Sequence, residues 1–293
     1  MGLEESDKGW GFHEGELRVQ RAAGVQPQAQ RLEGMLRPAD LSGGAARFLA
    51  AQTFAALTAH DRAGVLWTSP LAAPPGFLQG GTDVLRVAKL PRQGDPLHDL
   101  APGQDVGLVV VDFAARRRLR VNGHLVKVDA TGLEIAADQA YANCPQYIHR
   151  RHPDATRPAG TPAVGRRESP TLTSADELLI STADTFFLGT THPIRGSDAS
   201  HRGGPPGFVR VDSRSRLWWP DFPGNNMFNS LGNLAVDDES ALLFVDFTTG
   251  ATLHICGTAR LESAESNVPG AVPDRGIAFS VGAVVAVSTT SGS

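Results

Sequence analysis

The stretch SHRGGPPGF at residues 200–208 has an earlier copy, SPLAAPPGF, at residues 69–77. Five of the nine positions are identical, at an offset of 131 residues. Three further pairs of segments match in the same order and at nearly the same offset. Chance alone does not explain four such matches. The three further pairs are TFAALTAH (53–60) with TFFLGTTH (185–192), LVVVDF (108–113) with LLFVDF (242–247), and Gly94 and Leu100 with Gly224 and Leu231. The chain therefore contains an internal duplication.

Length and composition narrow the class of protein. With 293 residues the chain is long enough for two domains with separate cores. Its net charge of −4 argues against a nucleic-acid or membrane-surface partner, which would need a basic face. It has no 18-residue apolar run and no apolar segment at the N-terminus, so we expect neither a membrane span nor a secretory signal. The two cysteines, Cys144 and Cys256, form no disulfide framework, and a cytoplasmic location is expected.

Short apolar runs separated by turns indicate a mainly β protein with a few short helices. Residues 106–113 and 241–247 are β-branched and apolar, as buried strands are, and the chain has 32 Gly and 20 Pro. We expect two small antiparallel barrels in tandem. The predicted divisions are an N-terminal arm (1–44), a degenerate barrel (45–151), a linker (152–172) and a second barrel (173–293).

Local patterns predict how each copy begins and ends. Residues 173–177 (TSADE) form a capping-box pattern before a helix. The second copy should then form a hairpin between residues 186–191 and 208–211, which leaves 200–207 in the connection. Gly123 and Gly257 should end strands, and the stretch 277–287 has no evident counterpart in the first copy. In the arm, Trp10 and Phe12 are the expected docking anchors.

The connection Ser200–Gly204 carries the first candidate site. Two glycines allow backbone N–H groups to surround an anion, and Arg202 offers a planar pair of donors suited to a phosphate. The alternative is a hairpin turn with a solvated Arg202. The first copy has Leu71-Ala72-Ala73 where the second has Arg-Gly-Gly, so the turn alone does not require those residues.

The second candidate is the start of a predicted helix at Gly224-Asn225-Asn226, whose free N–H groups would attract an anion. The first copy has Gly94-Asp95-Pro96 there, and the carboxylate would repel a phosphate. Both anion-binding elements are thus altered together in the first copy. This correlated change predicts one site per chain.

The third candidate is the end of the first copy, where Asn143, Cys144 and Tyr147 lie within five residues. A structural cap with a buried cysteine is the alternative there. On the strand before Gly224, Trp218 and Trp219 point to opposite faces, so one could border the site, although core packing of both is equally expected.

Other polar groups suggest structure rather than chemistry. The three arginines at 116–118 look like a solvated strand end, and His60 and His192 occupy matching positions that suggest a shared structural role. His13-Glu14-Gly15-Glu16 lacks the spacing of a zinc protease motif, so we expect no metal site.

Three stretches of the chain resemble the pyridoxamine 5′-phosphate oxidase-like FMN-binding split-barrel proteins. They are residues 186–209, residues 220–226 with 231–233, and residues 143–148. The resemblance covers most of residues 45–285. In that family two barrels form a dimer, and FMN lies in the crevice between them. The resemblance implies that the FMN phosphate is held by Arg202 and by the other residues of its loop, Ser200, His201, Gly203 and Gly204. It implies that Asn225 and Asn226 hold the phosphate as well. It also places Trp219 and Pro220 near the flavin ring or ribityl chain.

Two fused barrels could imitate that dimer within one chain. The degenerate copy would then supply the partner wall, with Asn143, Cys144 and Tyr147, against a single FMN. The resemblance implies an FMN-dependent oxidoreductase that acts on a small-molecule substrate or electron donor, with no catalytic residue assigned, and the pseudo-dimer could pair again as a homodimer. The alternatives are a flavin carrier or sensor without enzymatic activity, a haem-binding relative that uses His201 or Cys144, and a structural homologue that binds nothing.

Overall fold

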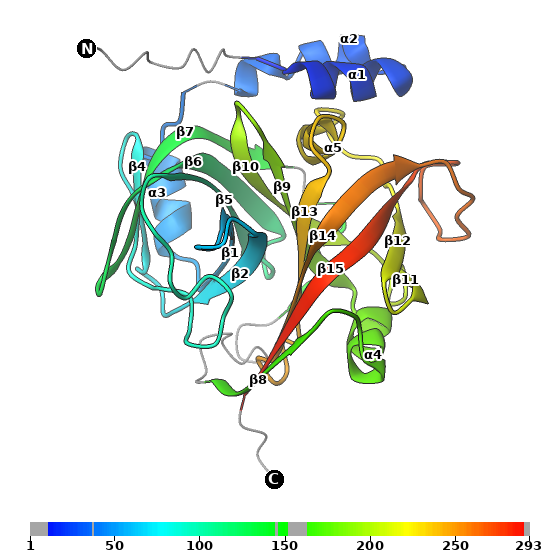
Figure 1. Cartoon of the computed structure of the whole chain (residues 1–293). Helices are drawn as coiled ribbons and strands as arrows, with labels where there is room; N and C mark the ends of the chain where they lie inside the picture. Colours follow the sequence, from blue (N-terminus) through cyan, green and yellow to red (C-terminus); the bar gives the residue numbers. More distant parts are fainter. Residues whose placement is uncertain (1–10, 37, 144–145, 152–162, 290–293) are drawn as a thin grey trace.

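The computed structural model describes residues 11–36, 38–143, 146–151 and 163–289, which form two antiparallel sheets (Figure 1). The strands of the first sheet run in the order β2-β1-β5-β6-β7-β4-β3. They are β1 Phe54–His60, β2 Leu66–Ala72, β3 Leu78–Gly80, β4 Val84–Val87, β5 Gln104–Asp112, β6 Arg117–Asp129 and β7 Gly132–Asn143.

The second sheet repeats this path strand for strand, in the order β10-β9-β13-β14-β15-β12-β11, with β8 added beside β15. Its strands are β8 Ala163–Ser169, β9 Thr185–His192, β10 Gly196–Gly203, β11 Arg210–Ser213, β12 Arg216–Pro220, β13 Glu239–Val245, β14 Thr252–Glu262 and β15 Gly276–Thr289. The mainly β fold and the duplication predicted from the sequence are therefore confirmed.

The strand registers show which residues of the two copies are equivalent. Leu71 pairs with Ala55 in the first sheet, and Arg202 pairs with Phe186 in the second. Both pairs are related by the 131-residue offset seen in the sequence. Leu71 and Arg202 thus occupy the same position in their respective copies.

Several sequence-based expectations are wrong in detail. The hairpin partner of β9 is β10, so residues 200–203 lie in a strand and not in a connecting loop. Gly123 and Gly257 mark β-bulges inside β6 and β14, because the register shifts there while both strands continue. Strand β15, which covers 277–287, is the counterpart of β7. Part of the segment predicted as linker, Ala163–Ser169, is strand β8.

The helices are short and lie outside the sheets. They are α1 Glu14–Ala22, α2 Gln26–Gln30, a 3-10 turn Glu33–Met35, α3 Gly43–Ala50, α4 Ser174–Thr182 and α5 Asn229–Leu234. The capping box predicted at Thr173 is confirmed, since its side chain and that of Asp176 bond each other's backbone N–H. None of the helices described is long and apolar enough to cross a membrane.

The N-terminal segment packs on the second copy. Helix α1 lies against α5, and Figure 1 shows α1 and α2 lying across the end of that sheet. Phe12 is buried with Leu36, Tyr141 and Met227, which fits its expected role as an anchor. Trp10 lies outside the described residues. Tyr141 belongs to the first copy and Met227 to the second, so this segment bridges both.

The two copies pack face to face as a pseudo-dimer. Strand β10 contacts β5 and β6, and its counterpart β2 contacts the equivalent strands β13 and β14. The approach is close: a Cβ added to Gly107 on β5 would meet the backbone of Asp198 and Ala199 on β10 at 2.6 Å. The pseudo-twofold arrangement creates two related interfaces, one beside β10 and one beside β2. They carry very different side chains.

Candidate functional site

The interface beside β10, called here the Arg202 interface, is polar on both sides. The second copy contributes alternate residues of β10, and the first copy contributes alternate residues of β6 and β7. They are Asp198, Ser200 and Arg202 from β10 and Arg118, Arg120, Asn122, Gln139 and Tyr141 from β6 and β7.

Arg202 is half-buried and forms no ion pair with any described residue. Its Nε atom is buried and has no hydrogen-bond partner. Burial lowers the pKa of the guanidinium to about 10, and the nearby Asp221 carboxylate only partly offsets this effect. That carboxylate is bound instead by Arg275, whose Nε lies 2.7 Å from it. A desolvated cation without a direct counter-charge is costly, so the site favours an anion.

Arg120 and Asp198 form the centre of the interface. Two hydrogen bonds of 3.2 Å join the Arg120 guanidinium to the Asp198 carboxylate, and both side chains are buried. Asn122 and Ser230 also donate to Asp198, at 3.3 and 2.8 Å. These bonds tie together β6, β10 and α5. They neutralise Asp198, so this carboxylate forms no ion pair with Arg202.

His201 lies on the other face of β10, between Phe113 and Phe187. Arg118 donates to its Nδ1 at 3.2 Å, so the imidazole is neutral with its proton on Nε2. Burial and the Arg118 charge lower the pKa of His201 well below its ordinary value. The ring is 3% exposed, which is opposite to the accessible iron ligand that the haem alternative requires. The other suggested iron ligand, Cys144, lies outside the described residues.

The segment after β7 reaches the end of β10. A Cβ added to Gly203 would collide with the carbonyl oxygen of Tyr147, so only glycine permits this approach. The Tyr147 ring lies 4.8 Å from the ring of Phe222, which follows Pro220 at the end of β12. Arg151 then binds Asp184 of the second copy. Tyr147 of the third predicted stretch is thus in contact with Gly203 of the first.

Other groups predicted to bind the phosphate form hydrogen bonds within the protein instead. The Gly204 N–H donates to the Asp184 carbonyl, and the Ser200 hydroxyl donates to the Leu188 carbonyl. These two groups therefore do not form the expected ring of free donors. The side chain of Asn143 and all of Cys144 lie outside the described residues.

The predicted helix start at 224–226 is wrong. Helix α5 begins at Asn229, after Phe228 in a left-handed conformation. Asn225 bonds within its own loop, since its Oδ1 accepts from the Met227 N–H at 3.2 Å and its Nδ2 lies 3.1 Å from the Met227 sulfur. Asn226 adopts φ of 62°. The loop turns toward the N-terminal segment, where Gln20 donates to the Met227 carbonyl at 3.2 Å, and not toward Arg202.

Both tryptophans are buried. Trp219 lies in the core of the second sheet against Phe186 and Phe279, and it is 1% exposed. Trp218 packs against Gly276 and below the Arg210 guanidinium. Core packing thus accounts for both rings. Pro220 ends β12, and the next residue is Asp221, the carboxylate that interacts most strongly with the Arg202 charge.

The equivalent interface beside β2, the Leu71 interface, is filled. Residues Trp67 and Leu71 stand where Asp198 and Arg202 stand in the second copy, and both belong to the apolar core of the first sheet. The facing strands carry Cys256, Ala283 and Val285 where the Arg202 interface has Asn122, Gln139 and Tyr141. Cys256 and Val285 are buried in that same core.

The loop between β4 and β5 fills the rest of the Leu71 interface. Asp95 and His254 are fully buried; Ser69 donates to Asp95, and His254 donates from Nδ1 to the Thr68 carbonyl at 2.9 Å. Arg92 donates to the Thr252 hydroxyl at 2.8 Å. The Asp95 carboxylate, expected to repel a phosphate, thus serves as a buried structural group.

Sequence reasoning missed most of the first copy's contribution. Arg118 was expected to be solvated with its neighbours, yet it turns into the interface toward His201. The signal was present in the alternation of β6, where Arg118, Arg120 and Asn122 share one face of a strand. The equivalent positions of β14 are Thr252, His254 and Cys256.

The pair His13 and His192 is close enough to suggest a metal, with ring centroids 4.3 Å apart. Their hydrogen bonds argue otherwise. His13 Nδ1 accepts from the Gly15 N–H, and His192 Nδ1 accepts from the N–H groups of Ile194 and Arg195. Each ring therefore carries its proton on Nε2 and offers no lone pair there.

No protein-family model and no curated protein sequence matches the chain. Among solved structures, a putative pyridoxamine 5′-phosphate oxidase from Lactobacillus delbrueckii is 15% identical, with a TM-score of 0.32, over 40% of this chain and 94% of its own. An FAD binding protein from Mycobacterium smegmatis is 13% identical, with a TM-score of 0.27, over 40% of this chain and 96% of its own.

A Clostridium acetobutylicum protein, described as related to general stress protein 26 and of the pyridoxinephosphate oxidase family, is 14% identical. Its TM-score is 0.27, over 36% of this chain and 81% of its own. The resemblance noted in the sequence is thus also found among solved structures. Identities and TM-scores this low indicate nothing about a cofactor or a reaction of this chain.

Proposed function

We propose that the chain binds one FMN at the Arg202 interface and acts as an FMN-dependent oxidoreductase on a small-molecule substrate or electron donor. The observation that carries this proposal is the state of Arg202. It is a desolvated guanidinium without an ion-pair partner among the described residues, where the sibling copy has a core leucine. A fold that merely needed a filled interface would have the leucine in both copies.

The surroundings of Arg202 fit a phosphorylated, aromatic ligand. A phosphate would supply the missing counter-charge and accept two parallel hydrogen bonds from the guanidinium. Tyr147 and Phe222 form an aromatic surface next to Gly203, which suits the flat part of a flavin. The roles predicted for Asn143, Cys144, Trp219, Pro220, Asn225 and Asn226 stay predictions.

A bound flavin would supply hydride or single-electron transfer. The chain's own residues would bind and orient it: Arg202 by charge, and Arg120 with Asp198 by holding the two copies in fixed register. The Leu71 interface is filled by Trp67, Leu71, Cys256 and Val285, so the proposal requires one flavin per chain.

Absorbance of the purified protein, after reconstitution with FMN and removal of free flavin, tests the proposal. We expect flavin bands at one FMN per chain, released on denaturation. An Arg202→Leu variant introduces the sibling's residue, so it should keep its stability and lose at least about a hundredfold in FMN affinity, because two charge-assisted hydrogen bonds are removed. Arg86→Leu is the matched control, since Arg86 is exposed on the first sheet and paired with Glu134.

Three outcomes would contradict the proposal: no FMN retained by the wild type, two FMN per chain, or unchanged affinity in Arg202→Leu. Activity is tested separately in the same preparation. Bleaching of the flavin bands by NAD(P)H or another reduced donor supports an oxidoreductase. Flavin that no donor bleaches supports the carrier or sensor instead.

A further inference from the structure

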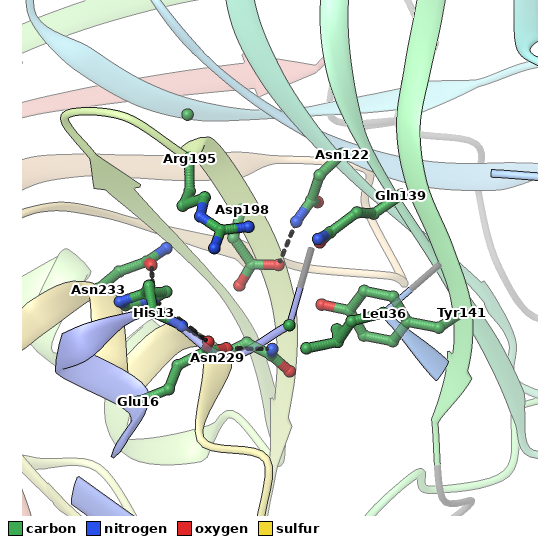
Figure 2. Close-up of a pocket in the computed structure, with 12 residues that line it drawn as sticks. His13, Glu16, Leu36, Asn122, Gln139, Tyr141, Arg195, Asp198, Asn229 and Asn233 are labelled. Atoms are coloured by element: carbon green, nitrogen blue, oxygen red, sulfur yellow. Dashed lines mark hydrogen bonds and ion pairs between the residues drawn. The ribbon is translucent and has the colours of Figure 1, made fainter. Parts of the chain in front are cut away.

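A small polar cavity of about 30 Å³ lies at the opposite end of the Arg202 interface, against the N-terminal segment (Figure 2). Six parts of the chain enclose it: that segment, β6, β7, the β9–β10 turn, β10 and α5. Figure 2 shows Arg195 entering from one side and His13, Glu16 and Asn229 closing the other. The volume has room for about two water molecules, or for a group of similar size such as a carboxylate.

Arg195 dominates the charge of this cavity. Its side chain is half-buried and forms no ion pair with a described residue, while its backbone N–H anchors the turn on His192. The other ionisable groups carry less charge or are paired. Asp198 is paired with Arg120, and burial lowers the pKa of His13 to about 4. Burial also raises the pKa of Glu16 to about 7, so it carries only part of its charge near neutral pH.

The remaining lining is built for hydrogen bonding. Four carboxamides face the cavity, together with the Tyr141 hydroxyl: Asn122, Gln139, Asn229 and Asn233. The Oδ1 atom of Asn122 is buried and accepts no hydrogen bond from a described residue. A ligand that combines a negative group with a hydroxyl would satisfy both Arg195 and this acceptor.

The sibling copy shows that this polarity is not needed for folding. The positions equivalent to Asn122, Gln139 and Tyr141 are Cys256, Ala283 and Val285, which pack as an apolar core. Since both copies reach the same fold, the polar version of this wall has another reason. A cavity that holds an arginine without an ion pair among the described residues, several carboxamides and an unsatisfied buried acceptor is suited to a polar ligand.

We propose that this cavity binds the carboxylate group of a small molecule, with Arg195 as its counter-charge and the N-terminal segment as its wall. The site needs no flavin. Only one part of this inference rests on the proposed function: that the bound carboxylate is the substrate of the flavin reaction. In that case the substrates are small carboxylates, and hydroxy acids among them gain a hydrogen bond to Asn122.

Calorimetric titration of the full chain with acetate, glycolate and acetamide at equal ionic strength tests this site. We expect acetate to bind at least tenfold more tightly than acetamide, its uncharged isostere, and glycolate more tightly than acetate. Arg195→Gln should weaken acetate binding at least tenfold. Arg86→Gln, the same exchange at an exposed arginine, should leave it unchanged. Because the cavity is closed by the N-terminal segment, acetate should also slow proteolysis of residues 11–36 in the wild type only.

The proposal is overturned if acetate does not bind, if acetamide binds as tightly as acetate, or if Arg195→Gln keeps full affinity. Folding of each variant is checked by its thermal transition, and Arg195→Lys, which keeps the charge, should retain part of the affinity. FMN content is measured on the same samples. Acetate binding without FMN would leave this site standing while the proposed function fails, and FMN binding without acetate binding would do the reverse.

Discussion

A single exchange of residues separates the two interfaces most clearly. Leu71 and Arg202 have the same strand register, yet one is a fully buried core residue and the other is a guanidinium without a direct counter-charge. Burying the leucine stabilises the fold by about 2 kcal/mol, whereas burying the arginine costs free energy. An exchange that lowers stability in this way indicates a function, and it places that function on one side of the pseudo-dimer.

Two buried groups in the N-terminal segment have opposite pH dependence. Burial raises the pKa of Glu16 from 4.5 to about 7 and lowers that of His13 from 6.5 to about 4. The folded protein keeps Glu16 protonated, so its contribution to stability is complete below pH 4.5 and is lost as the pH rises to 7. The contribution of neutral His13 is present above pH 6.5 and is lost as the pH falls toward 4. The two changes oppose each other between pH 4.5 and 6.5.

Glu16→Gln should expose this compensation. Glutamine resembles the protonated side chain, so relative to the wild type the free energy of unfolding should increase from pH 4.5 to pH 7, by up to about 3 kcal/mol. Urea unfolding at several pH values measures it. His13→Asn keeps a capping side chain at the start of α1. Relative to the wild type, its free energy of unfolding should decrease as the pH rises from 4 to 6.5. Parallel curves for Glu16→Gln and the wild type would show that Glu16 ionises normally in the packed segment.

Helices α1 and α5 are joined by a close backbone contact. A Cβ added to Gly15 would collide with the Gly232 carbonyl oxygen, and one added to Gly232 would meet Glu16. The two glycines let the helices approach until Glu16 reaches Asn229 and His13 reaches Asn233. This contact closes the cavity at the end of the Arg202 interface.

Gly15→Ala should therefore displace α1, although alanine is the better helix former. The expected loss of stability is about 1–3 kcal/mol, because the obstacle is backbone rather than a flexible side chain. Hydrogen exchange of α1 and proteolysis of residues 11–36 would both become faster. Gly44→Ala in α3 is the matched control, since its nearest neighbour is the end of Arg47 at 3.9 Å. It should be neutral or stabilising, and an equally protected α1 in Gly15→Ala would disprove the steric role.

At the scale of the whole molecule, the chain is a pseudo-dimer with one polar interface and one sealed interface. In a symmetric dimer both sites must change together, because one gene encodes both walls. Fusion of the copies removes that constraint. One interface could then become core, with Trp67, Leu71 and Val285, while the other kept its charges.

Leu71→Arg tests whether the sealed interface could regain a site. We expect a loss of at least about 4 kcal/mol in denaturant unfolding, because a charge enters a core that faces Cys256 and Val285. The number of FMN per chain should stay at one. Leu178→Arg is the control, since Leu178 is 65% exposed and should change stability by less than about 0.5 kcal/mol. A second bound FMN in Leu71→Arg would refute the view that the apolar wall prevents binding.

The duplication, the mainly β fold and the difference between Leu71 and Arg202 were all predictable from the order of residues alone. These features are local or repeated: strand patterns have a period of two residues, and two aligned copies reveal any position that changed. The capping box at Thr173 was predictable for the same reason, since its partners are three residues apart.

The three-dimensional packing of the sheets was needed to show which residues of the first copy lie at the Arg202 interface. Arg118 and Arg120 reach the interface because β5 and β6 of one sheet pack against β10 of the other, and residues some 80 apart in the chain meet there. Tyr141 lies beside them on β7, the neighbour of β6. The structure also shows that 200–203 form a strand, since β9 needs a pairing partner along its whole length. Contacts between distant segments depend on how whole sheets pack, and no local pattern of residues encodes that packing.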